Sequence, residues 1–250
     1  MLDRLEEVVV TARRAFPQWA DLQVIERPGW LQIVTPSLKT GGLNEVIYSL
    51  LDEHGADAAI DTAIAIYRDR GLKFRWNAGP GSGPIDLGER LERRGLTPSR
   101  GRGMARSTDV GDAGDASDVA GVVEVDRATV GDYTRVMASG WSAESAPLLA
   151  LHHHLLAEGR QRLFVAYCDG VAAAAGSYVA FARSAFLMRG VVVEAFRGRG
   201  LYRALVEARL RHARGRGISI ATTHARESTS APILEKLGFE TVCSIPMYFG

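Results

Sequence analysis

The stretch GVVVEAFRGRGLYRAL, residues 190–205, is the most informative part of this chain. A run of β-branched residues leads into a loop of arginine and glycine, and the loop opens into a helical pattern that runs to about Arg214. Glycines let backbone N–H groups approach an oxyanion closely, and the first turn of a helix offers unpaired donors at its positive end. Because Arg197, Arg199 and Arg203 add positive charge, the stretch predicts a site for a pyrophosphate group.

Two common phosphate-binding patterns do not fit this loop. A dinucleotide fingerprint needs a third glycine where the chain has Arg203, and a P-loop needs Gly-Lys-Ser/Thr, which is absent. The pattern Arg/Gln-x-x-Gly-x-Gly/Ala after a Val-rich strand does fit, at residues 197–202, and here the chain resembles the GCN5-related N-acetyltransferase (GNAT) superfamily. Tyr202 departs from that pattern, because the family usually has Gly or Ala there. A solvated Arg/Gly loop, or a nucleic-acid contact, is the simpler alternative.

The order of elements from about residue 120 to the end supports the resemblance. Asp169-Gly170 is a strong signal for a tight hairpin, and Leu237-Gly238-Phe239 resembles a second motif of the family. Sequence patterns predict strands at 163–167, 171–181, 184–193, 218–223 and 241–248, a helix at 201–214 and a short helix within 228–239. The resulting order, β-α-α-β-β-β-α-β-α-β, is the order of the family.

The first half of the chain repeats features of the second half. Residues 68–74, centred on Gly71, match residues 214–220 at an offset of 146, and residues 91–96 match residues 234–239 at an offset of 143. We therefore expect two copies of one fold, with chance similarity of short Arg/Gly/Leu words as the alternative. The expected class is α/β with mixed sheets, as two tandem GNAT-like acyl-CoA N-acyltransferase domains at 1–109 and 120–250, joined by a small, acidic linker at 110–119.

The repeat offset also predicts which copy works. The arginine and glycine loop falls on residues 51–54 of the first copy, Leu-Asp-Glu-His, which should repel a pyrophosphate. A strand at residues 44–48 can still precede that position. The first copy is therefore expected to keep the fold without a cofactor site, and to cover the second copy or shape its acceptor pocket.

Composition excludes several other classes of function. The net charge is +1, which argues against a large nucleic-acid-binding face, and 46% hydrophobic residues in 250 suffice for two modest cores. Residues 1–8 are acidic where a signal peptide would be basic, and no apolar run approaches membrane-spanning length. We expect a cytoplasmic protein that binds no membrane, with Cys168 and Cys243 as reduced thiols.

The resemblance implies which residues would hold acetyl-CoA. Its pantetheine arm would run along the strand before the loop, and the backbone N–H near Val192 would polarise the thioester carbonyl. One good oxyanion donor contributes roughly 3–4 kcal/mol to catalysis. The cofactor-binding residues expected on this basis are Val191, Val192, Val193, Arg197, Gly198, Arg199, Gly200, Leu201, Tyr202 and Arg203.

The groups that would transfer protons are less clear from the sequence. Many members of the family have a tyrosine, the general acid, where this chain has Leu234. His224 is the first candidate base, because it ends the strand beside the expected site and its unperturbed pKa suits pH 7. A hydrogen-bonded loop histidine is the alternative. Glu194 and Tyr202 follow, and Ser230 is a candidate that could equally be a helix cap.

Other polar and aromatic residues carry weaker signals. The run His152-His153-His154 does not favour a metal site, because consecutive helical residues point about 100° apart, and no metal cofactor is expected. The run, Trp141 and Tyr133 could line an acceptor pocket, while core packing is the competing explanation for the two aromatics. Packing is also the expected role of three tryptophans in the first half, Trp19, Trp30 and Trp76.

These observations predict an enzyme that transfers an acetyl or short acyl group from acetyl-CoA to an amine, by direct attack. The alternatives are a non-catalytic sensor of acyl-CoA, or an acyltransferase that uses a carrier-protein thioester. The expected acceptor is a small-molecule amine, nucleic acid is not expected as a partner, and the chain is expected to be a monomer or homodimer.

Overall fold

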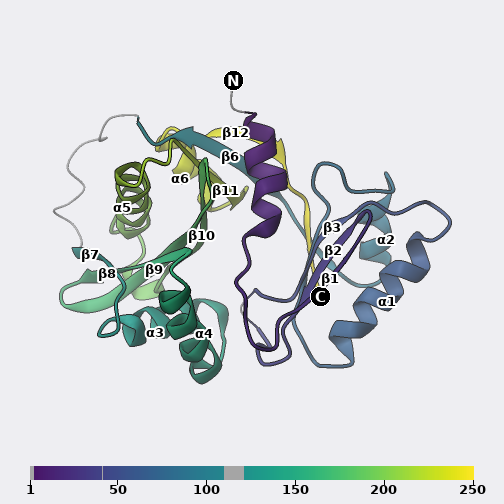
Figure 1. Cartoon of the computed structure of the whole chain (residues 1–250), viewed down its shortest axis with the longest axis horizontal. Coiled ribbons are helices and arrows are strands. Elements are labelled where there is room, and N and C mark those ends of the chain that lie inside the picture. The colour runs from purple at the N-terminus through teal and green to yellow at the C-terminus, as the bar shows by residue number, and fades with distance from the viewer. Residues whose placement is uncertain (1–2, 41, 110–120) are drawn as a thin grey trace.

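Two mixed β-sheets lie side by side in the computed structural model, which describes residues 3–40, 42–109 and 121–250 (Figure 1). A short N-terminal helical segment runs between them. It consists of η1 (Glu6–Val10) and η2 (Thr11–Arg14). The first sheet has six strands in the order β1-β2-β3-β4-β13-β5, and the second has seven in the order β12-β6-β11-β10-β9-β8-β7.

The first half of the chain supplies most of the first sheet and two helices that pack on it. Its elements are β1 (Gln23–Arg27), β2 (Trp30–Val34), β3 (Glu45–Ser49), α1 (Ala56–Arg68), β4 (Arg75–Asn77), α2 (Leu87–Arg93), β5 (Thr97–Ser99) and β6 (Gly101–Ser107). The apolar positions of α1 recur at helical spacing, with Ile60, Ile64 and Tyr67 all buried. They pack with Trp76 of β4 to form the core of this half.

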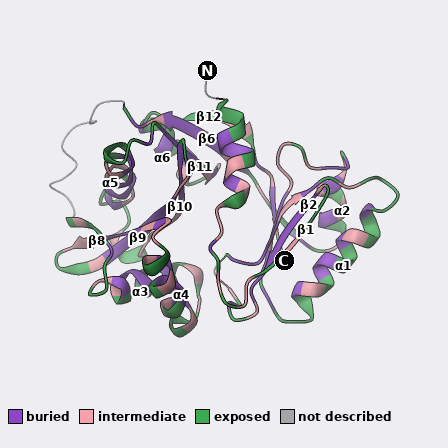
Figure 2. Ribbon diagram, in the orientation of Figure 1, coloured by how far each residue is buried: buried purple, intermediate pink, exposed green. Residues whose placement is uncertain are grey.

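The second half follows the order expected from its sequence. Its elements are β7 (Gly121–Glu124), α3 (Val130–Trp141), α4 (Ser145–Glu158), β8 (Gln161–Cys168), β9 (Val171–Ala180), β10 (Ser184–Val192), η4 (Glu194–Phe196), α5 (Leu201–Gly215), β11 (Ile220–Arg226), α6 (Ser230–Lys236), β12 (Glu240–Ser244) and β13 (Met247–Phe249). One core joins α5 and α6 to the second sheet, and a separate core joins α3 and α4 to it. Figure 2 shows the buried strands between these helices.

The two sheets share one topology, which confirms the tandem arrangement. In each, three antiparallel strands lead to a parallel neighbour across one helix, β3 to β4 across α1 and β10 to β11 across α5. The helices α2 and α6 then lie at corresponding places in the chain. The residues 51–54 indeed precede α1 as the arginine and glycine loop precedes α5.

The two halves exchange one strand each, which the sequence did not predict. The expected strand at 241–248 is interrupted at Ile245 and Pro246, and its second part, β13, crosses to the first sheet, where it pairs with β4 and β5. In return, β6 of the first half pairs with β11 and β12 in the second sheet. Each sheet is therefore completed by a strand from the other half.

Two further expectations concern the linker and membrane-spanning segments. The expected linker at 110–119 falls outside the described residues. Within the described ranges, no helix is both long and apolar enough to span a membrane.

Candidate functional site

The parallel strands β10 and β11 separate in the middle of the second sheet. They pair from Ser184 and Ile220 as far as Leu187 and Thr223. Beyond this point β10 has a bulge between Met188 and Val191, and it continues to pair only with β9. The edge of β10 that faces β11 is therefore open over its last residues, and Arg189, inside the bulge, has a φ of 59°. Such a positive φ is uncommon for a residue with a side chain and often marks a functional site.

The arginine and glycine loop follows β10 directly and leads into α5. Gly198 and Gly200 have φ values of 78° and 77°, and Gly200 is the residue before the helix. Among the described residues, the amides of Gly198, Arg199 and Gly200 donate to no backbone or side-chain acceptor. No heavy atom lies within 4 Å of where a Cβ of either glycine would be, so the loop borders open space at these two residues.

Three arginines surround this loop. Arg197 lies 4.0 Å from Glu194, Arg199 lies 3.5 Å from Asp169, and Arg203 lies 2.8 Å from Glu207. The guanidinium groups are well exposed, so these ion pairs are weak. Among the described residues, the loop therefore offers amides without acceptors, the N-terminus of a fifteen-residue helix and exposed cations, which together suit a pyrophosphate.

Tyr202 crosses the gap between β10 and α6. A Cβ on Gly190 would lie 2.7 Å from its Cε2 atom, so glycine is needed for this close approach. Burial raises the pKa of Tyr202, and a hydrogen bond with Ser230 opposes that rise. The structure thus brings two of the expected catalytic residues together, while Leu234 on α6 is buried in the core.

His224 lies on β11 just after the strands separate. Its Nε2 atom is 2.8 Å from the backbone carbonyl of Val8, and its ring meets Phe186 edge-on. Burial is the largest influence on the imidazole and lowers its pKa to about 4, so His224 is neutral at pH 7. Because Nε2 carries the proton that Val8 accepts, the lone pair is on Nδ1.

Glu194 lies apart from these groups. Its side chain is 89% exposed at the start of η4 and reaches toward Arg197. Glu194 is therefore a solvated carboxylate.

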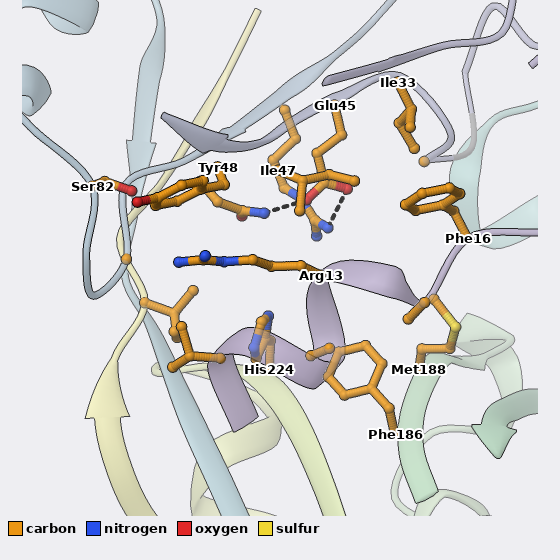
Figure 3. A pocket seen from close by; sticks show the side chains of 18 of the residues that line it. Arg13, Phe16, Ile33, Glu45, Ile47, Tyr48, Ser82, Phe186, Met188 and His224 are labelled. Atoms are coloured by element: carbon orange, nitrogen blue, oxygen red, sulfur yellow. Dashed lines mark hydrogen bonds and ion pairs between the residues drawn. The ribbon is translucent and has the colours of Figure 1, made fainter. Parts of the chain in front are cut away.

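A cavity that is open to solvent lies between the two halves, and we call it the interdomain cavity (Figure 3). The second half contributes Phe186 and Met188 of β10 and His224 of β11, where these strands separate. The opposite wall comes from the first half and carries the charged and polar groups Arg13, Glu45, Tyr48, Arg75 and Asn77.

The polar wall of the interdomain cavity is partly organised by ion pairing. Arg75 Nη2 lies 2.7 Å from Glu45, which is 7% exposed and also accepts from Asn77. Arg13 lies with its guanidinium 3.6 Å from the centre of the Tyr48 ring. The sequence does not indicate this wall, although it predicts a strand at 44–48. Glu45 and Arg75 come together only through the pairing of β3 with β4.

A second set of polar groups is buried beneath the bulge. Both terminal nitrogens of Arg189 are buried and have no hydrogen-bond partner among the described residues, and the same holds for Tyr133 Oη and His152 Nε2. The Arg189 guanidinium lies 5.7 Å from the Trp141 ring. The Nδ1 atom of His152 contacts the hydroxyl of Thr134 at 2.8 Å, and burial lowers the pKa of His152 to about 3.

The remaining histidines of the run lie elsewhere on α4. The ring of His154 packs edge-on against Trp19. Across the described ranges, no group of three or more His, Cys, Asp or Glu side chains could hold a metal ion. Cys168 and Cys243 carry free thiols.

Comparison with known proteins agrees with this geometry. Residues 127–239 match the sequence model of the Acetyltransferase (GNAT) family. No curated protein sequence matches the chain.

Solved structures resemble the whole chain, both halves included. A conserved protein of unknown function from Staphylococcus epidermidis ATCC 12228 has a TM-score of 0.66 at 13% identity, over 92% of this chain and 94% of its own. A GCN5-related N-acetyltransferase from Kribbella flavida has a TM-score of 0.66 at 13% identity, over 92% and 89%. A tandem GNAT protein from the clavulanic acid biosynthesis pathway has a TM-score of 0.57 at 13% identity, over 99% and 93%. At these identities the likeness concerns the fold.

The fold belongs to the mixed α/β class, with a central sheet in the second half that splits between β10 and β11. More particularly, residues 127–239 match the GNAT family model, and the fold of the whole chain resembles that of a tandem GNAT protein. The match to this family supports N-acyltransferase activity in general terms.

Proposed function

We propose that this chain is an acetyl-CoA-dependent N-acyltransferase that acetylates a small-molecule amine by direct attack. The observation that supports this most strongly is the open edge of β10, which leads into three unpartnered amides at the start of α5. If the arginine and glycine loop were only a solvated surface loop, there would be no reason for the edge of β10 beside it to be left without a paired strand.

The residues around the loop fit coenzyme A. Gly198, Arg199 and Gly200 would bind the pyrophosphate through their amides, with Arg197 and Arg203 neutralising its charge. Residues 191–193 would hold the pantetheine arm through backbone groups on the open edge. When bound, acetyl-CoA supplies a thioester carbonyl that an amine can attack.

The acceptor would enter from the interdomain cavity. Met188 and His224 line this cavity at the point where β10 and β11 separate, so the cavity meets the proposed donor groove there. The Nδ1 atom of His224 would accept the proton of the attacking amine, and Tyr202 with Ser230 would supply a hydroxyl near the groove. These roles stay predictions, and so does the role of the more distant Glu194 as a base.

One observation favours a second candidate function. Leu234 is 1% exposed and apolar where many family members have their general acid, so a protein that binds acyl-CoA without turning it over is the alternative. Transfer from a carrier-protein thioester is a further alternative, and a salt-sensitive complex with an acylated carrier protein would favour it. A cytoplasmic location, a monomer or homodimer, and the absence of nucleic-acid and membrane partners stay expectations from the sequence.

Release of free thiol from acetyl-CoA distinguishes an enzyme from a sensor. The purified full chain is incubated with acetyl-CoA and a panel of primary amines, and thiol is measured against Arg199→Glu as control. Acceptor-dependent release by the wild type alone is expected. Tight binding of acetyl-CoA with no release for any amine would favour the sensor.

A further inference from the structure

The interdomain cavity carries more positive than negative charge. Of the residues that line it, only Arg13, Arg75 and Glu45 are charged, because His224 is neutral at pH 7. Glu45 is occupied by Arg75 and Asn77. One guanidinium on the wall therefore has no carboxylate to balance it.

Arg13 is that unbalanced group. No acidic side chain in the described part of the chain lies within ion-pair distance of it, and Glu6 attracts it only from farther away. Its Nη2 atom donates to the carbonyl of Pro80, at 3.3 Å, and the guanidinium also interacts with Tyr48. Figure 3 shows the guanidinium extending across the cavity between Tyr48 and His224. An arginine stays protonated even when partly buried, and it has five N–H donors, so it brings a full charge and further donors into the cavity.

Two further arginines lie near the interface of the two halves. Arg189, with both terminal nitrogens unpartnered, interacts electrostatically with Glu45 and Arg75 across the interface of the two halves. The Nε atom of Arg75 is likewise buried without a partner. A buried charge is unfavourable unless an opposite charge joins it.

We propose that the acceptor is an amine that also carries a carboxylate, and that Arg13 binds this carboxylate in the interdomain cavity. The inference rests on the proposed acyl transfer and gives the first half a task, recognition of the acceptor. An arginine fork matches the two oxygens of a carboxylate. With the carboxylate on Arg13, the amine of the same molecule points to the wall formed by Met188 and His224.

Binding of matched pairs of amines tests this without relying on turnover. Calorimetric titrations of the full chain, saturated with coenzyme A or free of it, compare lysine with cadaverine, phenylalanine with phenethylamine, and 4-aminobutyrate with propylamine. The proteins are wild type, Arg13→Met, Arg13→Lys and the control Arg14→Met. Arg14 is the next residue on η2 and pairs with Glu26 outside the cavity.

The expected result is that at least one carboxylate-bearing member binds wild type about tenfold or more tightly than its partner. This preference should vanish in Arg13→Met, return in part in Arg13→Lys and persist in Arg14→Met. Equal affinity within every pair, absence of binding by every carboxylate, or a preference that survives Arg13→Met would overturn the inference. Thiol release from acetyl-CoA with cadaverine or propylamine would leave the proposed acyl transfer standing in each of those cases, whereas failure to bind coenzyme A would count against that function.

Discussion

The imidazole of His224 donates through Nε2 to the backbone carbonyl of Val8, at 2.8 Å. This bond joins β11 of the second sheet to η1, the segment that runs between the two sheets (Figure 1). It also fixes the tautomer, so the Nδ1 lone pair is the one that can accept a proton at the interdomain cavity. The first residues of the chain thus set the chemistry of a residue more than two hundred positions later.

One buried and one partly buried histidine should make the protein sensitive to acid. The pKa values of His224 and His152 are lowered by burial to about 4 and about 3, below the unfolded value of about 6.5. The unfolded chain therefore binds protons more tightly, and stability should fall as the pH drops from about 6.5 toward 4, by on the order of 1–3 kcal/mol for each histidine. Above pH 6.5 this contribution is constant.

Denaturant unfolding between pH 7 and pH 4 measures this loss. His224→Gln and His152→Asn keep a nitrogen donor near the bonded position but do not titrate, so each should flatten the pH dependence. A slope that is unchanged in both variants would contradict the assignment.

Close packing of α3 on β10 should make Gly140 intolerant of a side chain. A Cβ there would lie 2.3 Å from Cγ1 of Val191, so Gly140→Ala should lower the free energy of unfolding by about 1–3 kcal/mol. Because Val191 belongs to the open edge of β10, affinity for acetyl-CoA should fall as well. Gly131→Ala on the same helix meets no atom within 4 Å and should be neutral or gain up to about 1 kcal/mol. Equal thermal stability of the two variants would argue against this packing.

Arg209 should be needed to hold the bulge of β10. It is 2% exposed on α5, and its Nη1 atom donates to the carbonyls of Ser177 and Met188, at 3.0 and 3.4 Å. Arg209→Met would leave both carbonyls without this donor, and each unsatisfied group costs about 1–3 kcal/mol. We expect lower stability and weaker acetyl-CoA binding than in Arg211→Met, an exposed arginine on the same helix. Wild-type stability and binding in Arg209→Met would exclude this role.

The exchange of strands should make the two halves depend on each other. Without β13, the strands β4 and β5 lose their shared partner, and without β6 the same holds for β11 and β12. Fragments 1–109 and 110–250 expressed separately should be protease-sensitive, and co-expression should restore a folded complex. Cooperative unfolding of either fragment alone would contradict the expectation.

The sequence predicted the order of elements because each depends on local signals. The hairpin at Asp169-Gly170, the glycine that ends each motif helix and the β-branched run before the loop all act within a few residues. The repeat at offsets of 146 and 143 residues is matched by equivalent helices and strands in the two sheets.

Features that depend on contacts between the halves escaped sequence analysis. A proline at position 246 is present in the sequence, but no local sequence signal shows that Met247–Phe249 pairs with β4. The wall formed by Arg13 and Glu45 is assembled from segments that meet only in the folded chain. The burial that weakens His224 as a base also comes from tertiary packing, which the sequence pattern does not express.

Binding of acetyl-CoA to the arginine and glycine loop is the central claim, and calorimetric titration tests it most directly. Wild type is compared with Arg199→Glu, which reverses a charge at the loop, and with Arg70→Glu, a matched reversal in the first half. Arg70 is exposed at the end of α1. The account predicts binding by wild type and by Arg70→Glu, and its loss in Arg199→Glu. Absence of binding by folded wild type, or equal binding by all three proteins, would contradict it.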